Sequence, residues 1–278
     1  MRIVTLMEDT ACAPAFACEH GLSFYIEANG KKLLFDMGQT DLFVRNAQTL
    51  GVPLEEVDTA FVSHGHYDHG GGLAAFLEMN RRAPVYLHRQ AFEPHFSQKP
   101  DGIRPIGLEP ALAHSERLVL TDGVTQISDT LTLFSDVTGQ DCCPGGNRTL
   151  FEWENGAYVP DRFQHEQSLI VREGDKVALF TGCAHRGVVN ICARAREIIG
   201  RDPDFVIGGM HLFSPSTGKS EPDENIRAVA ARLAQTGSHY YTCHCTGQHA
   251  FAVLRETLGE RISFLAAGSV TELQSIQK

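Results

Sequence analysis

The chain has 278 residues, of which 42% are hydrophobic and 21% are charged, so it can bury a core without disulfide bonds and is not a disordered protein. Its formal net charge of -10 disfavours a protein that follows nucleic-acid phosphates over a broad surface. No apolar run approaches the roughly 20 residues of a membrane span and the apolar start is too short for a signal peptide, so we expect a cytoplasmic protein without nucleic-acid or membrane partners.

The first part of the chain alternates predicted strands with predicted helices. Short apolar and β-branched runs predict strands over residues 3–6, 22–27, 32–36 and 59–63. Helical spacing of apolar residues predicts helices over residues 41–50 and 73–80. The last of these strands leads to a histidine cluster that begins at His64, so we expect this cluster at the carboxyl end of a buried strand.

The segment 88–161 has a less regular pattern, and four prolines interrupt it between residues 94 and 110. This pattern predicts loops and short edge strands, which we interpret as a substrate cover. The chain shows no internal repeat, low-complexity tract or linker. We therefore expect one domain over residues 1–278, with the cover inserted at 88–161.

The later part of the chain returns to a regular alternation. Strands are predicted over residues 167–171, 176–181, 205–207 and 240–242, and helices over residues 188–199 and 221–235. A histidine follows three of these strands, namely His185, His211 and His244. Because the site of an α/β sheet lies beyond the carboxyl ends of its strands, we expect these histidines near the cluster at His64.

The segment from His64 to His69 carries three histidines and an aspartate within six residues. These side chains lie too close together for all of them to bind one tetrahedral ion with good geometry, so the spacing predicts two ions. Imidazoles suit zinc, iron or manganese, and Asp68 adds negative charge that supports a second cation. Two ions about 3.5–4 Å apart acidify water and clamp phosphoryl or carbonyl oxygens. The alternative is a loop of polar residues whose side chains form hydrogen bonds with the backbone. Three histidines and an aspartate beside a triple glycine have no obvious packing role, which disfavours this alternative.

Residues 63–72 resemble the signature loop of the metallo-β-lactamase superfamily, and residues 33–38 resemble the strand and Asp-x-Gly turn that precede that loop in the family. The resemblance implies an α/β fold, specifically a four-layer αββα sandwich with mixed sheets and a dinuclear metal site at one edge. It implies two divalent metal ions as cofactors, with zinc expected and iron or manganese as alternatives.

The same resemblance implies roles for individual residues. His64 and His66 would bind one ion, whereas Asp68 and His69 would bind the other, and Asp68 would also act in catalysis. His185 lies two residues beyond the position at which the family usually has a bridging aspartate, and we expect it to bind the first ion.

Four further residues leave alternatives open. Cys183 occupies the position of the usual bridging aspartate, and it is either a thiolate ligand or a small buried residue. His165 is either a ligand or a polar residue that opens a strand. The last metal-binding histidine of the family lies near the C-terminus, after a helix and a strand, and His244 fits this position. His211 is the alternative ligand at this position, or it contacts the substrate.

Motifs over residues 19–23, 181–190, 208–212 and 243–247 together resemble one branch of the superfamily, which includes the archaeal dihydropterin–ribofuranosylaminobenzene phosphate synthase. In this branch a Thr-Gly-Cys followed by a histidine is the expected form, so the absent bridging aspartate is a branch trait. The eight cysteines are too sparse for a disulfide scaffold, and several lie beside histidines, which indicates reduced thiols near metal.

The motifs and the family resemblance together predict an enzyme that acts on a small anionic molecule. We expect a metal-dependent hydrolase or transferase of a phosphorylated or pyrophosphorylated substrate, with a pterin as the candidate, and His20, His211 and Arg186 as substrate contacts. Other candidate cations, each of which could equally be a solvated surface charge, are Lys219, Arg104, Arg148 and Arg162. The alternatives are a lactonase or thioesterase acting on a carbonyl, and a metal-dependent ligand sensor without turnover.

Overall fold

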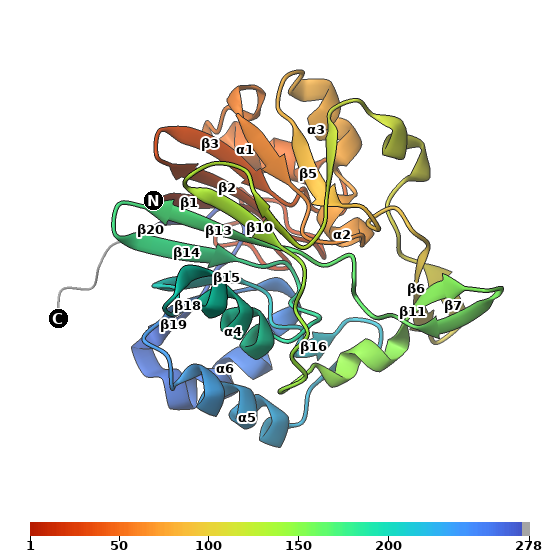
Figure 1. The fold of residues 1–278 in the computed structure, drawn as a ribbon, viewed down its shortest axis with the longest axis vertical. Coiled ribbons are helices and arrows are strands. Elements are labelled where there is room, and N and C mark those ends of the chain that lie inside the picture. The colour runs from red at the N-terminus through yellow and green to blue at the C-terminus, as the bar shows by residue number, and fades with distance from the viewer. Residues whose placement is uncertain (274–278) are drawn as a thin grey trace.

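Two mixed β-sheets stack face to face, and helices cover their outer sides (Figure 1). The computed structural model describes residues 1–273. The first large sheet has the order β20-β1-β2-β3-β4-β5-β8, formed by Val270–Glu272, Arg2–Met7, Ser23–Ala28, Lys31–Phe35, Thr59–Phe61, Val85–His88 and Leu118–Thr121. The second has the order β19-β18-β15-β14-β13-β10-β9, formed by Ile262–Phe264, His239–Thr242, Phe205–Gly208, Lys176–Phe180, Ser168–Glu173, Leu131–Phe134 and Val124–Gln126.

The direction of the side chains alternates along each strand, and this explains why the sheets are covered on both faces. Phe24 of β2 and Phe180 of β14 lie in the apolar cluster between the two sheets, whereas Tyr25 and Leu179, the residues next to them, lie in the clusters beneath the helices. Successive strand residues point to opposite faces, so each sheet buries both of its sides. This arrangement is the predicted four-layer αββα sandwich, and the fold-class prediction is confirmed.

The helices divide between the two outer faces. On the first sheet lie α1 (Leu42–Leu50), the short α2 (Tyr67–Gly70) and α3 (Leu73–Met79), and on the second lie α4 (Val188–Ile199), α5 (Asp223–Leu233) and α6 (Gln248–Leu258). The sequence prediction omits α6, although its buried residues follow helical spacing: Ala250, Val253, Leu254 and Leu258. In the part of the chain that the structure describes, no helix is long and apolar enough to cross a membrane.

The segment 88–161 divides between the sandwich and a separate small sheet. That sheet has the order β12-β11-β6-β7, formed by Ala157–Pro160, Leu150–Glu154, His95–Lys99 and Gly102–Pro105, and it projects from one end of the molecule (Figure 1). Strands β8, β9 and β10 belong instead to the two large sheets, with β8 and β9 at their edges. The remaining elements are short: β16 (Phe213–Ser214), β17 (Lys219–Ser220), and the 3-10 turns η1 (Leu54–Glu56), η2 (Pro110–His114), η3 (Gly145–Thr149), η4 (His244–Thr246) and η5 (Gly259–Arg261).

Parallel pairing brings several strand ends to the same edge of the sandwich. Strands β14, β15 and β18 are parallel neighbours in the second sheet, and β3 and β4 are parallel neighbours in the first. The chain leaves these strands directly before the segments that begin at His64, Cys183, His211 and His244. The fold therefore gathers side chains that are far apart in the sequence.

The inter-sheet core gives a first prediction. Phe180 is fully buried and its ring lies 6.4 Å from that of Phe24 and 6.0 Å from that of Phe35. Phe180→Ala should lower the free energy of unfolding by about 3–5 kcal/mol, because it removes apolar contacts and leaves a cavity. Denaturant unfolding measures this. Val124→Ala, at a position that is 47% exposed, should change stability by less than about 0.5 kcal/mol, and equal effects of the two substitutions would contradict the four-layer packing.

Candidate metal centre

The loop that follows β4 is held by close backbone packing against the turn at residues 37–40. A Cβ atom added to Gly71 would lie 2.1 Å from the carbonyl oxygen of Gln39, and one added to Gly72 would lie 2.2 Å from that of Met37. Such contacts leave no room for a side chain, so the glycines permit this close approach. The packed turn fixes the path of the loop that carries His64, His66, Asp68 and His69.

His64, His66 and His185 form a first group of candidate ligands. Their ring centroids lie 4.5 to 5.0 Å apart, and all three side chains are buried. In each ring Nε2 is buried and has no hydrogen-bond partner among the described residues. Leaving a buried acceptor unsatisfied costs about 1–3 kcal/mol, so three such atoms in one place fit a cation that all three would coordinate.

The protonation of these rings suits metal binding. Burial, followed by the neighbouring histidines, holds the pKa of His64, His66 and His185 well below the ordinary value, so the imidazoles are neutral. His185 Nδ1 lies 3.0 Å from Asn147 Oδ1, to which it can donate, and this leaves the lone pair on Nε2. The backbone N–H of His185 donates to Glu166 over 2.6 Å, which fixes the main chain at this ligand.

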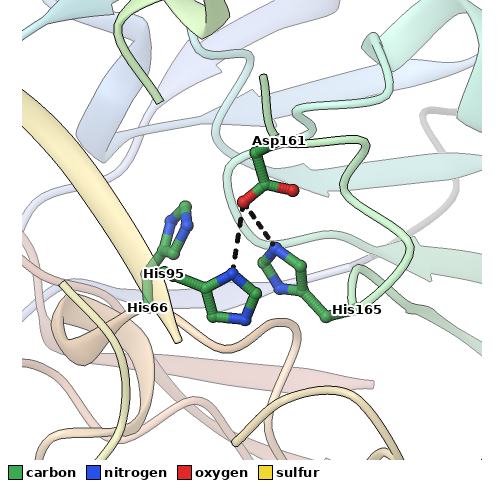
Figure 2. A group of neighbouring side chains, drawn as sticks. All are labelled: His66, His95, Asp161 and His165. Carbon is green, nitrogen blue, oxygen red and sulfur yellow. Dashed lines mark hydrogen bonds and ion pairs between the residues drawn. The ribbon is translucent and has the colours of Figure 1, made fainter. Parts of the chain in front are cut away.

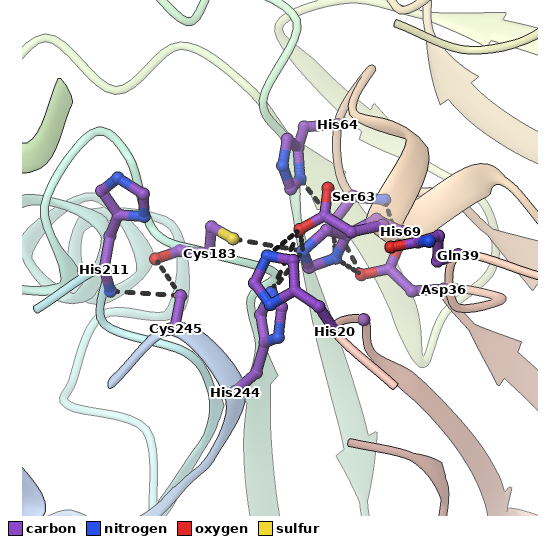
Figure 3. A network of polar contacts seen from close by, with 12 residues as sticks. His20, Asp36, Gln39, Ser63, His64, His69, Cys183, His211, His244 and Cys245 are labelled. Atoms are coloured by element: carbon purple, nitrogen blue, oxygen red, sulfur yellow. Dashed lines mark hydrogen bonds and ion pairs between the residues drawn. The ribbon is translucent and has the colours of Figure 1, made fainter. Parts of the chain in front are cut away.

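Asp68, His69 and His244 form a second group of candidate ligands. Asp68 Oδ2 lies 3.6 Å from His69 Nε2 and 3.3 Å from His244 Nε2, and the two Nε2 atoms are 3.2 Å apart. A carboxylate orients each imidazole through Nδ1. His69 Nδ1 is 2.6 Å from Asp36 (Figure 3), and His244 Nδ1 is 2.6 Å from Asp9. Histidine ligands of metals are commonly held in this way, since the hydrogen bond at Nδ1 sets both the ring orientation and the tautomer.

Cys183 lies between the two ligand groups. Its Sγ is 3.1 Å from His69 Nε2 and also falls within 4.8 Å of ligand atoms of His64 and His185. The thiol follows β14, and the next residue, Ala184, has a φ of 58°, an unusual conformation that turns the chain sharply after Cys183. The chemistry of a thiolate at this position suits a ligand that two cations share.

The structure brings His20 and His211 to the same cavity as the ligand groups. His20 Nε2 lies 3.3 Å from Asp68 Oδ2, and its Nδ1 lies 2.9 Å from Asp9. Burial disfavours a charged His20, but its hydrogen bonds with Asp68 and Asp9 outweigh this effect and raise its pKa to about 9. The cavity is lined by His20, Gln39, His66, Tyr67, Asp68, Ser97, Lys99, Ile106, Thr149, Leu150, Cys183, His185, His211, Ser214, Pro215, Ser216 and Cys245.

Two other predicted residues have different surroundings. The guanidinium of Arg186 donates to the carbonyl oxygens of Val137 and Arg162 and lines a separate cavity, so the structure does not bring it to the ligand groups. Both ring nitrogens of His165 are engaged, because Nδ1 accepts the backbone N–H of Gly65 over 2.9 Å and Nε2 lies 3.3 Å from Asp161. These contacts tie His165 to the metal loop and to Asp161, in a group of possible metal ligands that also contains His66 and His95.

A buried polar cluster links the metal loop to the small sheet. Asp161 Oδ2 lies 3.2 Å from His95 Nδ1 and 3.3 Å from His165 Nε2, and the His95 ring lies beside that of His66 (Figure 2). Contacts with both histidines outweigh the desolvation of the Asp161 carboxyl and hold its pKa far below the usual range. A buried anion with two such donors is well satisfied, so the cluster fastens the small sheet to the loop.

Several residues of the site are absent from the sequence prediction. Asp9 follows β1 directly, so the strand-end rule that found the histidines also applies to it. His95, Asn147 and Lys99 lie in the irregular segment 88–161, where no periodicity indicated which side chains face inward. The positions of these residues depend on long-range contacts of the small sheet, which the local sequence does not reveal.

Comparisons with known proteins give consistent results. The family model of the metallo-beta-lactamase superfamily matches residues 17–195, more than half of the chain. The 7,8-dihydropterin-6-methyl-4-(beta-D-ribofuranosyl)-aminobenzene-5'-phosphate synthase of Methanocaldococcus jannaschii is 28% identical, over 97% of this chain and 96% of its own. The crystal structure of Tm1679, a metal-dependent hydrolase of the beta-lactamase superfamily, is 29% identical with a TM-score of 0.82, covering 99% of this chain and 100% of that one. A diphosphatase of the PhnP family shares the fold at 15% identity and a TM-score of 0.54, over 98% of both chains.

The carboxylate behind His69 gives a second prediction. Asp36 is fully buried and accepts from the backbone N–H and the hydroxyl of Ser63, both over 2.7 Å, as well as from His69. Asp36→Asn should weaken metal binding by about 10–100-fold, because an amide cannot accept from all these donors and the His69 ring would turn. Competition with a chromophoric chelator measures the affinity.

Asp58→Asn is the matched control for this substitution. Asp58 also accepts a backbone N–H, that of Lys32 over 2.9 Å, but it lies before β4 and so at the opposite end of the strand from the metal loop. Its replacement should leave the affinity unchanged. Equal losses in the two variants would show that Asp36 acts on general stability and not on the ligand.

Proposed function

The chain belongs to the metallo-β-lactamase superfamily, and from this membership we propose that it is a metal-dependent enzyme that hydrolyses or transfers a phosphoryl or pyrophosphoryl group of a small molecule. One observation carries the proposal: the buried Nε2 atoms of His64, His66 and His185 have no hydrogen-bond partners among the described residues, and their rings lie 4.5 to 5.0 Å apart beside the group of Asp68, His69 and His244. Six side chains would hold two divalent cations, with Cys183 between them.

Each part of the site has a distinct task in this proposal. Two bound divalent cations would supply Lewis-acid activation of water and of the substrate and would offset the negative charge that develops in the transition state. Asp68 would orient the attacking group from its place between His69 and His244, and His20 would hold Asp68 through its Nε2 contact. The buried ligands exclude bulk water from this side of the cavity, which strengthens the electrostatic interactions.

The cavity wall supports a substrate with both an apolar ring and an anionic group. Tyr67, Ile106 and Leu150 form an apolar side, and Lys99 lies on the same cavity. The Lys99 ammonium donates to Ser216 over 2.9 Å and forms no salt bridge within the described residues, so its charge is available to a ligand. A relative that is named as a synthase of a dihydropterin-linked phosphate supports a pterin or an arylamine phosphate as the class of substrate.

Removal of metal gives a third prediction. Protein loaded with zinc, manganese or iron should turn over bis(p-nitrophenyl) phosphate or a pterin pyrophosphate supplied with an arylamine, and chelation should abolish both reactions. His66→Ala should lower turnover by about 100-fold or more, because the loss of a ligand exceeds the 10–100-fold effect of losing a residue behind it. His249→Ala, an exposed histidine that contacts Asp223, should have no effect.

The outcomes of this experiment separate the functional classes. Turnover that survives complete chelation would contradict the proposal. Hydrolysis of thioesters or lactones with no reaction of either phosphorus compound would favour the carbonyl hydrolase, and ligand binding without any turnover would favour a sensor.

The Lys99 ammonium gives a fourth prediction. Ribose 5-phosphate should inhibit the turnover of bis(p-nitrophenyl) phosphate more strongly than ribose does, because the phosphate can accept from Lys99. Lys99→Met should raise the inhibition constant about 10-fold, the equivalent of one hydrogen bond to a charged group. Lys31→Met, on an exposed residue at the start of β3 and so at the end of the strand away from the metal loop, is the control. An unchanged constant in Lys99→Met would mean that the phosphate binds elsewhere.

A further inference from the structure

A third group of side chains that could hold a metal ion lies against the same cavity. The ligand atoms of Cys183, His211 and Cys245 all fall within 4.8 Å of one another, and all three residues are buried (Figure 3). They come from the ends of β14, β15 and β18, which are parallel neighbours in the second sheet. His211 and Cys245 take no part in the two ligand groups described above.

His211 is aimed into this group and lacks a partner there. Its Nδ1 is buried with no hydrogen-bond partner among residues 1–273, and the ring edge that carries Nδ1 faces Cys183 (Figure 3). The opposite edge faces η3, since a Cβ atom at Gly146 would lie 3.3 Å from Nε2. His211 also has a φ of 48°. Such strained backbone conformations persist where the surrounding structure enforces them, and they cluster at functional sites.

The backbone makes room for the thiol of Cys245. A Cβ atom at Gly209 would lie 2.5 Å from Cys245 Sγ, so only glycine at this position lets the thiol approach. The same Sγ accepts the backbone N–H of His211 over 3.3 Å and lies 3.5 Å from the carbonyl oxygen of Cys183. Cys192 is different: it lies in the apolar cluster beneath α4 and takes no part in the groups of candidate ligands described above.

We propose that Cys183, His211 and Cys245 form a third cation position, which binds zinc or another thiophilic divalent ion and takes its fourth ligand from the cavity. Two thiolates and an imidazole suit such an ion, and three protein ligands with one open position are the arrangement of zinc sites that exchange ligands. All three residues line the cavity, so a substrate oxygen could reach the open position. The inference rests on the proposed function through Cys183, which this position would share with the metal pair.

Metal analysis of the full chain tests the inference. Protein reconstituted with excess zinc under reducing conditions and dialysed against metal-free buffer should hold three zinc ions per chain, and Cys245→Ala and His211→Ala should each hold two. The matched controls are Cys192→Ala, which removes another buried thiol, and His88→Ala, which removes another buried histidine outside this cavity. Both controls should hold three ions.

Cobalt substitution gives a second readout that does not depend on activity. The thiolate-to-cobalt charge-transfer band of the wild-type protein should lose intensity in Cys245→Ala and stay unchanged in Cys192→Ala. If Cys245→Ala does not fold, as judged by circular dichroism, the zinc content of His211→Ala and the cobalt spectrum of the wild type decide the question.

The failures of the two proposals can be told apart. Two ions in the wild type and in both variants would overturn the third position and leave the pair intact. A disulfide between Cys183 and Cys245 that persists under reducing conditions would overturn it as well. A wild-type chain that binds no metal at all would contradict the proposed function together with this inference.

Discussion

The structure depends on one constraint, the cost of burying imidazole nitrogens that have lone pairs and no donor to satisfy them. His64, His66 and His185 each place Nε2 in the interior, and Asp68 adds a carboxylate beside two further rings. Neutral rings that turn their acceptors toward one point repel each other unless a positive charge lies between them. A bound cation would remove both costs and would couple ion binding to the stable packing of this edge.

The sandwich holds these side chains in place by fixing the segments that carry them from several sides. Glycines 71 and 72 press the loop against the turn at residues 37–40, and Asp36 joins that turn to His69. In the second sheet, Cys183 and His244 lie close to the ends of the strands β14 and β18, which limits their freedom to move. The small sheet closes a further side through Asp161 and His165. Ligands held in this way lose little entropy when an ion binds.

The sequence predicts the regular part of this arrangement well. Periodicity locates the strands β1 to β4, β13 to β15 and β18 and the helices α1, α3, α4 and α5, and the signature loop identifies the family and with it the αββα fold. The position of His244 at a strand end also follows from local pattern. The surroundings of Arg186 and His165 do not, because their hydrogen bonds join segments far apart in the chain, such as His165 and Gly65. Lys99 is missed for the same reason, because its place at the cavity depends on the pairing of the small sheet, whereas Asp9 lies just after β1, where the strand-end rule could have identified it.

The central claim is that cations occupy the two points on which the six side chains converge. Anomalous diffraction from crystals of the zinc-loaded protein, recorded on both sides of the zinc absorption edge, tests it most directly. We expect one peak within coordination distance of the Nε2 atoms of His64, His66 and His185, and a second within that distance of Asp68, His69 and His244. A map without peaks at this edge, with the imidazoles turned toward protein or solvent partners instead, would contradict it.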